Sequence, residues 1–265
     1  MGPVAGSGPV TDETGRIARG IRQRIEMDRL VGWDPPLSKR RLRPAAKGGG
    51  AAARKDPPPA RAEAPGDSGP RNEERSAGRR VKLDVIRAEV AACRSCDLCR
   101  TRTQTVFGVG DPETRLLFVG EGPGADEDRQ GEPFVGRAGR LLNDIIKAMG
   151  LRREQVYIAN VVKCRPPENR VPNAAEVGSC IGFLERQIEI IAPEVIVTLG
   201  SVATKALLGV ESSMGKLRGR FHVYRGIPLM PTYHPAYLLR NPSEKRKVWE
   251  DIQLVMENLG MKIPS

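Results

Sequence analysis

Four short apolar runs, each bounded by turn-forming residues, constrain the fold of this chain more than any other feature. They occupy residues 116–119, 156–158, 195–199 and 227–230. Apolar runs of this length without an alternation of polar residues are typical of strands that are buried on both faces of a parallel sheet. Gly, Pro or Asn comes within two residues of the end of each run, as expected where a strand ends.

Helical patterns separate the four runs. One apolar stripe ends at Gly150, a residue type that favours helix termination, and three further patterns cover residues 175–191, 202–208 and 244–259. Strands that alternate with helices favour an α/β fold. We therefore predict a three-layer α/β/α sandwich with a central, mostly parallel four-stranded sheet.

The first 80 residues have a different composition. Residues 34–80 contain 8 Pro, 6 Gly and 9 Ala, and their only large aliphatic side chains are Leu37 and Leu42. Such a stretch cannot bury enough apolar surface to offset the entropy of ordering it. We predict an extension over residues 1–80, with a short amphipathic helix at about 16–31 and then a disordered linker, followed by a catalytic domain over residues 81–265.

The chain is strongly basic, and the linker carries much of the excess. The net charge is +11, and residues 34–80 contribute 12 basic against 6 acidic side chains. A basic balance indicates a polyanionic partner, most often nucleic acid. The extension therefore either contacts DNA phosphates without reading sequence or serves as a solubilising linker.

Other classes of protein are excluded by simple counts. No stretch approaches the roughly 18 consecutive apolar residues of a membrane helix, and residues 1–10 lack a secretory pattern. Five cysteines, three of them within residues 93–99, do not form an even disulfide framework. We expect no membrane partner and a reducing compartment.

The residues that follow the strands are the candidates for function, because ligands of α/β sheets bind beyond the carboxyl ends of the strands. Residues 120–124 read Gly-Glu-Gly-Pro-Gly, a tight turn that a ligand can approach closely. The turn lacks the Gly-Lys-Ser/Thr ending of a phosphate-binding loop, and the acids that follow would repel phosphate. A small neutral or cationic ligand fits better.

Two further strand ends carry polar side chains. Asn160 follows the second run, and its amide complements an imide edge such as N3–H and O4 of uracil, although a structural role is also open. His234 follows the fourth run between Tyr and Pro and is the better candidate for chemistry of the two histidines. His222 falls within an apparent strand and is interpreted as structural. Ser201, after the third run, is interpreted as a helix cap.

The cysteines suggest a metal centre. Cys93 and Cys96 form a Cys-x-x-Cys pair, and Cys164 and Cys180 follow later in the chain. Four thiolates bind either zinc or an iron-sulfur cluster, and the number of ligands does not decide between them. Cys99 is either a spare thiol or a competitor for one ligand position. A redox dithiol is disfavoured because no helix begins at Cys93.

These features together resemble the family 4 uracil-DNA glycosylases, the iron-sulfur branch of their superfamily. The resemblance covers residues 81–259 and rests on Gly-Glu-Gly-Pro-Gly with Glu127-Asp128, on residues 131–136, on Asn160 with Lys-Cys-Arg-Pro at 163–166, and on His234-Pro235. It implies a 4Fe-4S cluster held by Cys93, Cys96, Cys164 and Cys180, with Cys99 outside the ligand set.

The resemblance also implies roles for individual residues. The uracil pocket would comprise the backbone of Glu121 and Gly122, Glu127, Phe134 stacked on the base, Asn160 and His234. Glu127 would stabilise the sugar cation or the attacking water, and His234 the anionic O2 of the leaving base. Leu238, Leu239 and Arg240 would enter the DNA as the wedge that replaces the flipped base.

The implied activity is excision of uracil from single- and double-stranded DNA by hydrolysis of the N-glycosidic bond, the first step of base excision repair. The alternative is a relative that binds or cross-links uracil-DNA without turnover, but residues 165–173 lack the histidine that such cross-linking uses. A non-catalytic cluster protein would not need Glu127, Asn160 and His234 together. The resemblance implies a monomer of prokaryotic type, located in the cytoplasm near the nucleoid.

Overall fold

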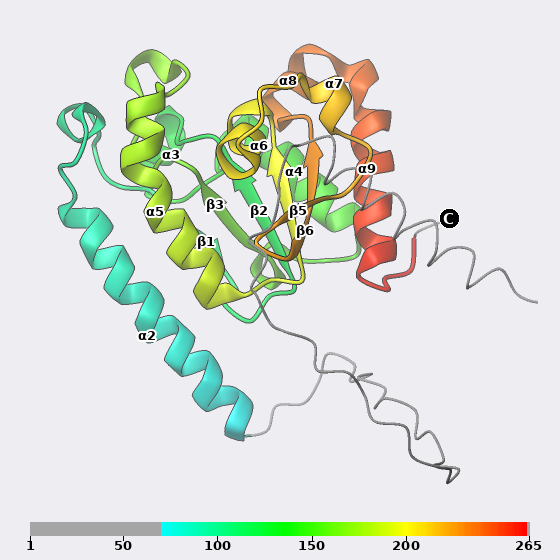
Figure 1. Cartoon of the computed structure of the whole chain (residues 1–265), viewed down its shortest axis with the longest axis horizontal. Helices are drawn as coiled ribbons and strands as arrows, with labels where there is room; N and C mark the ends of the chain where they lie inside the picture. The colour runs from blue at the N-terminus through cyan, green and yellow to red at the C-terminus, as the bar shows by residue number, and fades with distance from the viewer. Residues whose placement is uncertain (1–69, 264–265) are drawn as a thin grey trace, which may run out of the picture. The chain divides into compact units, whose positions relative to one another are not determined.

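The computed structural model describes residues 70–263, with side chains from residue 76 onward (Figure 1). The helix predicted at about 16–31 and the linker up to residue 69 lie outside the described residues. No helix among residues 70–263 is long and apolar enough to span a bilayer.

The sheet has a parallel centre and two antiparallel edges. Its order is β1-β3-β2-β4-β6-β5, with parallel pairing from β3 through β2 and β4 to β6. The strands are β1 (Val109–Gly110), β2 (Leu116–Gly120), β3 (Tyr157–Asn160), β4 (Val195–Leu199), β5 (His222–Tyr224) and β6 (Ile227–Thr232). The α/β fold with a mostly parallel sheet is confirmed, but the predicted width of four strands is corrected to six within residues 70–263.

The two added strands are short or partly exposed, which explains why their sequences do not read as buried runs. Strand β1 has two residues, and β5 has one exposed and one partly exposed residue among its three. His222 lies in β5 as expected, and a ring nitrogen pairs with the carbonyl oxygen of Leu217 at 2.9 Å. Edge strands need only one buried face, so their apolar signal is weak.

Helices cover both faces of the sheet and complete the three layers. Successive residues of β2 point to opposite faces: Leu117 and Val119 pack into one core cluster, whereas Leu116 and Phe118 pack into the other. The first cluster also receives side chains from α2 (Pro70–Ala92), α5 (Ala174–Ile191) and α6 (Ser201–Leu208). The second receives side chains from α4 (Arg137–Ala148), α8 (Pro235–Arg240) and α9 (Lys245–Asn258).

The remaining elements are short. They are the helices α3 (Ala125–Gln130) and α7 (Met214–Leu217) and the 3-10 turns η1 (Asp97–Arg100), η2 (Arg153–Gln155), η3 (Pro167–Asn169) and η4 (Pro242–Glu244). Helices α4, α5, α6 and α9 match the four helical patterns predicted from the sequence. Helix α3 directly follows the glycine-rich end of β2, so its first turn lies beside the carboxyl ends of the strands.

Helix α2 begins eleven residues before the domain boundary placed at residue 81, so the structure differs from the predicted linker over residues 70–80. Leu83, Ile86 and Val90 are buried in the first core cluster, and Figure 1 shows α2 alongside α5. Arg79, the tenth residue of the helix, ties it to the rest of the domain, because its Nη1 donates to the carbonyl oxygens of Pro112 at 2.9 Å and Ile191 at 2.8 Å. Composition alone misses the helical conformation of residues 70–80, because the contacts of Arg79 are with segments far along the chain.

Candidate active site and metal centre

Phe134, Asn160 and His234 meet at the carboxyl ends of the parallel strands. Asn160 ends β3 and is paired with Gly120, the last residue of β2. A Cβ atom on Gly120 would lie 2.4 Å from Oδ1 of Asn160 and 2.6 Å from Cζ of Phe134, so both side chains lie directly against this glycine. The rings of Phe134 and His234 have centroids 5.5 Å apart. The structure thus brings together three of the residues selected from the sequence.

Asn160 has an unused hydrogen-bond acceptor. Its side chain is 1% exposed, and Oδ1 has no hydrogen-bond partner among residues 70–263. A buried acceptor without a donor costs roughly 1–3 kcal/mol, so such atoms are rare in folded proteins and call for an explanation. A ligand with an N–H group would satisfy Oδ1.

Glu127 holds the loop that carries Phe134. Its Oε1 accepts hydrogen bonds from the backbone N–H groups of Val135 at 3.0 Å and Gly136 at 3.1 Å, and its Oε2 accepts from Gly124 at 3.1 Å. A carboxylate oxygen offers about two lone pairs, so Oε1 is fully used and Oε2 keeps one free. Glu127 is therefore a structural anchor that retains one acceptor position.

His234 is held in one tautomer as a neutral ring. The backbone N–H of Ala236 donates to Nδ1 at 3.1 Å, so the proton of the neutral imidazole resides on Nε2. Burial lowers the pKa of His234 to about 4, and the positive charge of Arg240 acts in the same direction, whereas Glu127 opposes both. At neutral pH the ring therefore presents an uncharged N–H donor.

The turn after β2 approaches β3 closely. The carbonyl oxygen of Glu121 accepts from the N–H of Val162 at 3.1 Å. A Cβ on Gly122 would lie 2.6 Å from Cγ2 of Val162, so the turn cannot hold a larger residue without moving. Burial raises the pKa of the Glu121 carboxyl. The sequence predicts that the backbone of Glu121 and Gly122 lines the uracil pocket. In the structure, the hydrogen bond to Val162 holds this backbone near Asn160.

Helix α8 corrects one predicted wedge residue. Leu238 is 1% exposed and belongs to the second core cluster, so it cannot enter DNA without opening the core. Leu239 is 38% exposed and Arg240 is also exposed, and both remain candidates for contact with DNA. Tyr237, which the sequence analysis did not select, is 36% exposed on the same short helix. The packing of α8 against α4 determines that Leu238 is buried while Tyr237 and Leu239 are exposed.

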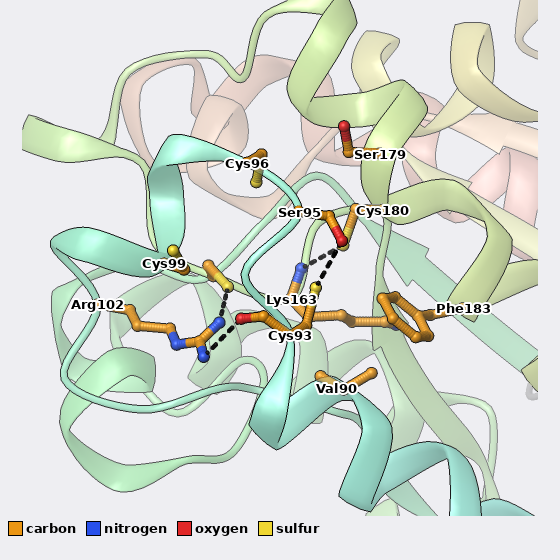
Figure 2. Close-up of a pocket in the computed structure, with 11 residues that line it drawn as sticks. Val90, Cys93, Ser95, Cys96, Cys99, Arg102, Lys163, Ser179, Cys180 and Phe183 are labelled. Carbon is orange, nitrogen blue, oxygen red and sulfur yellow. Dashed lines mark hydrogen bonds between the residues drawn. The ribbon is translucent and has the colours of Figure 1, made fainter.

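All five cysteines line one hollow, which is shown in Figure 2. The hollow encloses about 280 Å³, including space open to solvent, and is lined by Cys93, Cys96, Cys99, Cys164 and Cys180. All five are free thiols. Within residues 70–263, no three His, Cys, Asp or Glu side chains are arranged to hold a metal ion. The structure nevertheless gathers the predicted ligands around one space, together with Cys99.

Hydrogen-bond donors contact two of these thiols. Arg102 donates from Nη1 to Sγ of Cys164 at 3.0 Å, and the backbone N–H of Lys163 donates to Sγ of Cys180 at 3.3 Å (Figure 2). Burial raises the pKa of Cys180 to about 11 and that of Cys164 in the same direction, so neither favours a free thiolate. The donor set fits a thiophilic metal or an iron-sulfur cluster, whose positive charge would stabilise the thiolates.

Lys163 joins the two sites, and the sequence analysis did not select it for this role. Its side chain is fully buried, and Nζ donates to the carbonyl oxygen of Asn160 at 2.8 Å and to Oε1 of Gln187 at 2.6 Å. Burial lowers the pKa of Lys163 to about 8. In the sequence, only the position of Lys163 between Asn160 and Cys164 indicated that it could link the two sites. Its partner Gln187 comes from α5 and gave no such indication.

Comparison with known proteins agrees with the resemblance seen in the sequence. The family described as the Uracil DNA glycosylase superfamily matches residues 107–253. A type-4 uracil-DNA glycosylase of Thermotoga maritima is 49% identical over 175 residues, which cover 64% of this chain and 91% of that protein. Its counterpart in Sulfurisphaera tokodaii is 46% identical, covering 66% of this chain and 84% of that protein.

A more distant group is also similar. A type-5 uracil-DNA glycosylase of Thermus thermophilus is 35% identical over 150 residues, which cover 49% of this chain and 68% of that protein. Similarity is therefore higher, and extends over more of the chain, for the type-4 proteins.

The tautomer and charge of His234 predict its titration. Because the pKa is lowered to about 4, the ring stays neutral through pH 5 to 8, and protonation occurs well below the ordinary range near 6.5. The unfolded chain binds this proton more tightly, so the stability contributed by neutral His234 is complete above pH 6.5 and falls as the pH drops toward 4.

Imidazole NMR shifts provide the measurement, because the chain has only two histidines and a His222→Gln variant identifies the second signal. We expect the His234 midpoint near pH 4 and an Nε2-protonated ring at neutral pH. A midpoint at or above 6.5 would contradict the burial argument.

Proposed function

The chain belongs to the uracil-DNA glycosylase superfamily, and on that premise we propose how its pocket works as a DNA N-glycosylase. The enzyme hydrolyses the N-glycosidic bond of deoxyuridine in DNA, releases uracil and leaves an abasic site for base excision repair. The observation that most supports the assignment of the pocket is the buried, unpartnered Oδ1 of Asn160 beside Phe134 and His234.

We propose that the flipped base is recognised at its imide edge. Oδ1 of Asn160 accepts from N3–H of uracil, and the amide NH₂ group donates to O4. The ring of Phe134 stacks on the base, and the backbone at Glu121 and Gly122 closes the pocket. The unpaired acceptor is satisfied only when a base with an N–H at this position enters. The site therefore binds uracil in preference to an apolar ligand, which would leave the acceptor unpaired.

Bond cleavage leaves negative charge on uracil and positive charge on the sugar. Nε2–H of His234 donates to O2, and a neutral donor suits this role because its proton stays on the enzyme while the anion develops. We assign the free acceptor position on Oε2 of Glu127 to the sugar cation or the attacking water; the single hydrogen bond that Oε2 accepts, from Gly124, supports this assignment. Both groups are fixed by backbone hydrogen bonds before the substrate binds, so little reorganisation is required.

The exposed side chains of α8 support a role in holding the DNA open. Leu239 offers an apolar surface that can take the place of the extruded base, and Arg240 offers a charge for the adjacent phosphate. Leu238 has no part in this proposal.

We propose a 4Fe-4S cluster bound by Cys93, Cys96, Cys164 and Cys180. The thiol-lined hollow and the donors from Arg102 and Lys163 support this ligand set. A bound cluster would supply iron–thiolate bonds that cross-link the segment after α2, the segment after β3 and helix α5. Its contribution is therefore to the fold around the base pocket.

The remaining properties are proposals on physical grounds. A DNA substrate and five free thiols support a location in the cytoplasm, near the nucleoid, and a base pocket built from the residues of one chain supports a monomer. The basic N-terminal extension is proposed to add phosphate contacts that do not read sequence.

Excision of uracil tests the pocket. The Asn160→Ala variant should lose about 100-fold or more in kcat/KM on single-stranded and U:G-containing oligonucleotides, since it removes the hydrogen bonds to the imide edge. Asn258→Ala, an exposed asparagine at the end of α9, is the matched control and should behave as the unaltered enzyme.

A fall of less than about threefold in Asn160→Ala would sink the assigned recognition. An unaltered enzyme that binds uracil-DNA without releasing the base would instead support a binding protein without turnover.

Iron content tests the cluster. Cys180→Ser should lose iron, sulfide and visible absorbance, because it removes a proposed ligand from α5. Cys99→Ser should retain all three, because Cys99 lines the hollow but lies outside the proposed ligand set. If Cys99→Ser loses the cluster while Cys180→Ser keeps it, the ligand assignment is wrong.

The salt dependence of DNA binding tests the extension. A chain beginning at residue 70 should show a shallower slope of log K against log salt concentration than the full chain, by about 0.9 for each phosphate that the extension neutralises. An abasic duplex is the probe, so that excision does not disturb the measurement. Identical slopes for the two chains would show that the extension does not bind phosphates.

A further inference from the structure

The loop that carries Phe134 is held from two sides by opposite charges. Glu127 accepts from the N–H groups of Val135 and Gly136, as described above. Arg153, in η2, donates from Nη2 to the carbonyl oxygen of Pro133 and from Nη1 to that of Phe134 at 3.4 Å. Nη1 also donates to Oδ1 of Asn143 in α4 at 3.0 Å. The guanidinium therefore joins α4 and η2 to the loop.

One peptide bond receives both charges. The carbonyl oxygen of Phe134 and the N–H of Val135 belong to the same peptide group, so Arg153 and Glu127 bind its opposite ends. A peptide dipole between a cation at its oxygen and an anion at its hydrogen is held firmly in one orientation. The direction of the following chain and of the Phe134 side chain is thereby fixed.

This loop needs such support because its backbone conformation is unfavourable. Phe134 has φ of +55°, in the left-handed region that residues with a side chain rarely adopt. The carbonyl group of Phe134 also packs against Gly139, where a Cβ would lie 1.8 Å from its oxygen. Without the charged contacts, the loop would be free to relax toward an ordinary conformation, and the ring would leave Gly120 and His234.

We propose that Arg153 is a positioning residue for base stacking, which together with Glu127 sets the ring of Phe134 before uracil enters the pocket. The inference rests on the proposed role of Phe134. Preorganisation of this kind lets the stack form without ordering the loop during binding. Arg153 is partly buried and its guanidinium binds the carbonyl oxygens of Pro133 and Phe134, so its effect on the base passes through the loop.

The test compares DNA with and without a base to stack. One duplex carries 2′-fluoro-2′-deoxyuridine, whose fluorine resists cleavage, and the other carries a tetrahydrofuran abasic analogue at the same position. Arg153→Gln should weaken binding of the first by about tenfold, the size of one base stack, and leave binding of the second within about twofold. A general structural defect would weaken both equally and would overturn the proposal.

Three further variants sharpen the test. Arg152→Gln makes the same change at the neighbouring exposed residue and should leave both affinities unchanged. Arg153→Lys keeps the charge without the planar fork and should restore part of the affinity, and it replaces Arg153→Gln if that variant does not fold. In a Phe134→Ala background, Arg153→Gln should cause no additional loss, because both changes remove the same stack.

An additional loss of about tenfold in the Phe134→Ala background would show that Arg153 acts elsewhere and would overturn the inference. A different result would refute the proposed function itself. In that case the unaltered enzyme would neither release uracil nor bind the 2′-fluoro-2′-deoxyuridine duplex more tightly than the abasic duplex. If the unaltered enzyme does both and Arg153→Gln retains the full preference, only the role of Arg153 is refuted.

Discussion

The proposed base pocket depends on the absence of a side chain at Gly120. This residue ends the central strand β2, and its Cα is the surface against which Asn160 and Phe134 pack. Any Cβ at this position would overlap both side chains. The parallel pairing of β2 with β3 places Gly120 opposite Asn160, so the hydrogen-bonded register of the sheet determines where the amide lies. The geometry of the site therefore originates in the sheet rather than in the surrounding loops.

Charged side chains then fix the parts that the sheet does not reach. Glu127 and Arg153 hold the Phe134 loop at its amides and its carbonyls, and a backbone N–H fixes the tautomer of His234. These interactions are individually modest, but each acts in a partly buried place where water competes poorly. Their combined effect is a pocket whose donor, acceptor and stacking surface are oriented before a ligand arrives, which is what catalysis by preorganised electrostatics requires.

Hydrogen bonds of Lys163 connect the thiol-lined hollow to the proposed base pocket. Lys163 donates from its backbone to Cys180 and from its side chain to the carbonyl oxygen of Asn160, and Gln187 of α5 accepts from the same Nζ. Helix α5 carries both Cys180 and Gln187. A group bound to the cysteines would restrain Lys163 and α5, and through them the end of β3. This connection gives a physical reason for the proposed cluster to affect the proposed base pocket even when it takes no part in the chemistry.

The sequence by itself determined the layers, the four central strands and the residues at their ends, because buried strands and strand-end motifs are local patterns of residue type. It placed His222 in a strand but did not reveal β1, whose apolar signal is weak, or the helical conformation of residues 70–80, where Arg79 reaches Pro112 and Ile191. It could not separate buried Leu238 from exposed Leu239, since both are leucines on one short helix. Nor could it find Arg153 or the Lys163–Gln187 pair. Those interactions join segments that only tertiary packing brings together, so the roles of these side chains were decided by the fold.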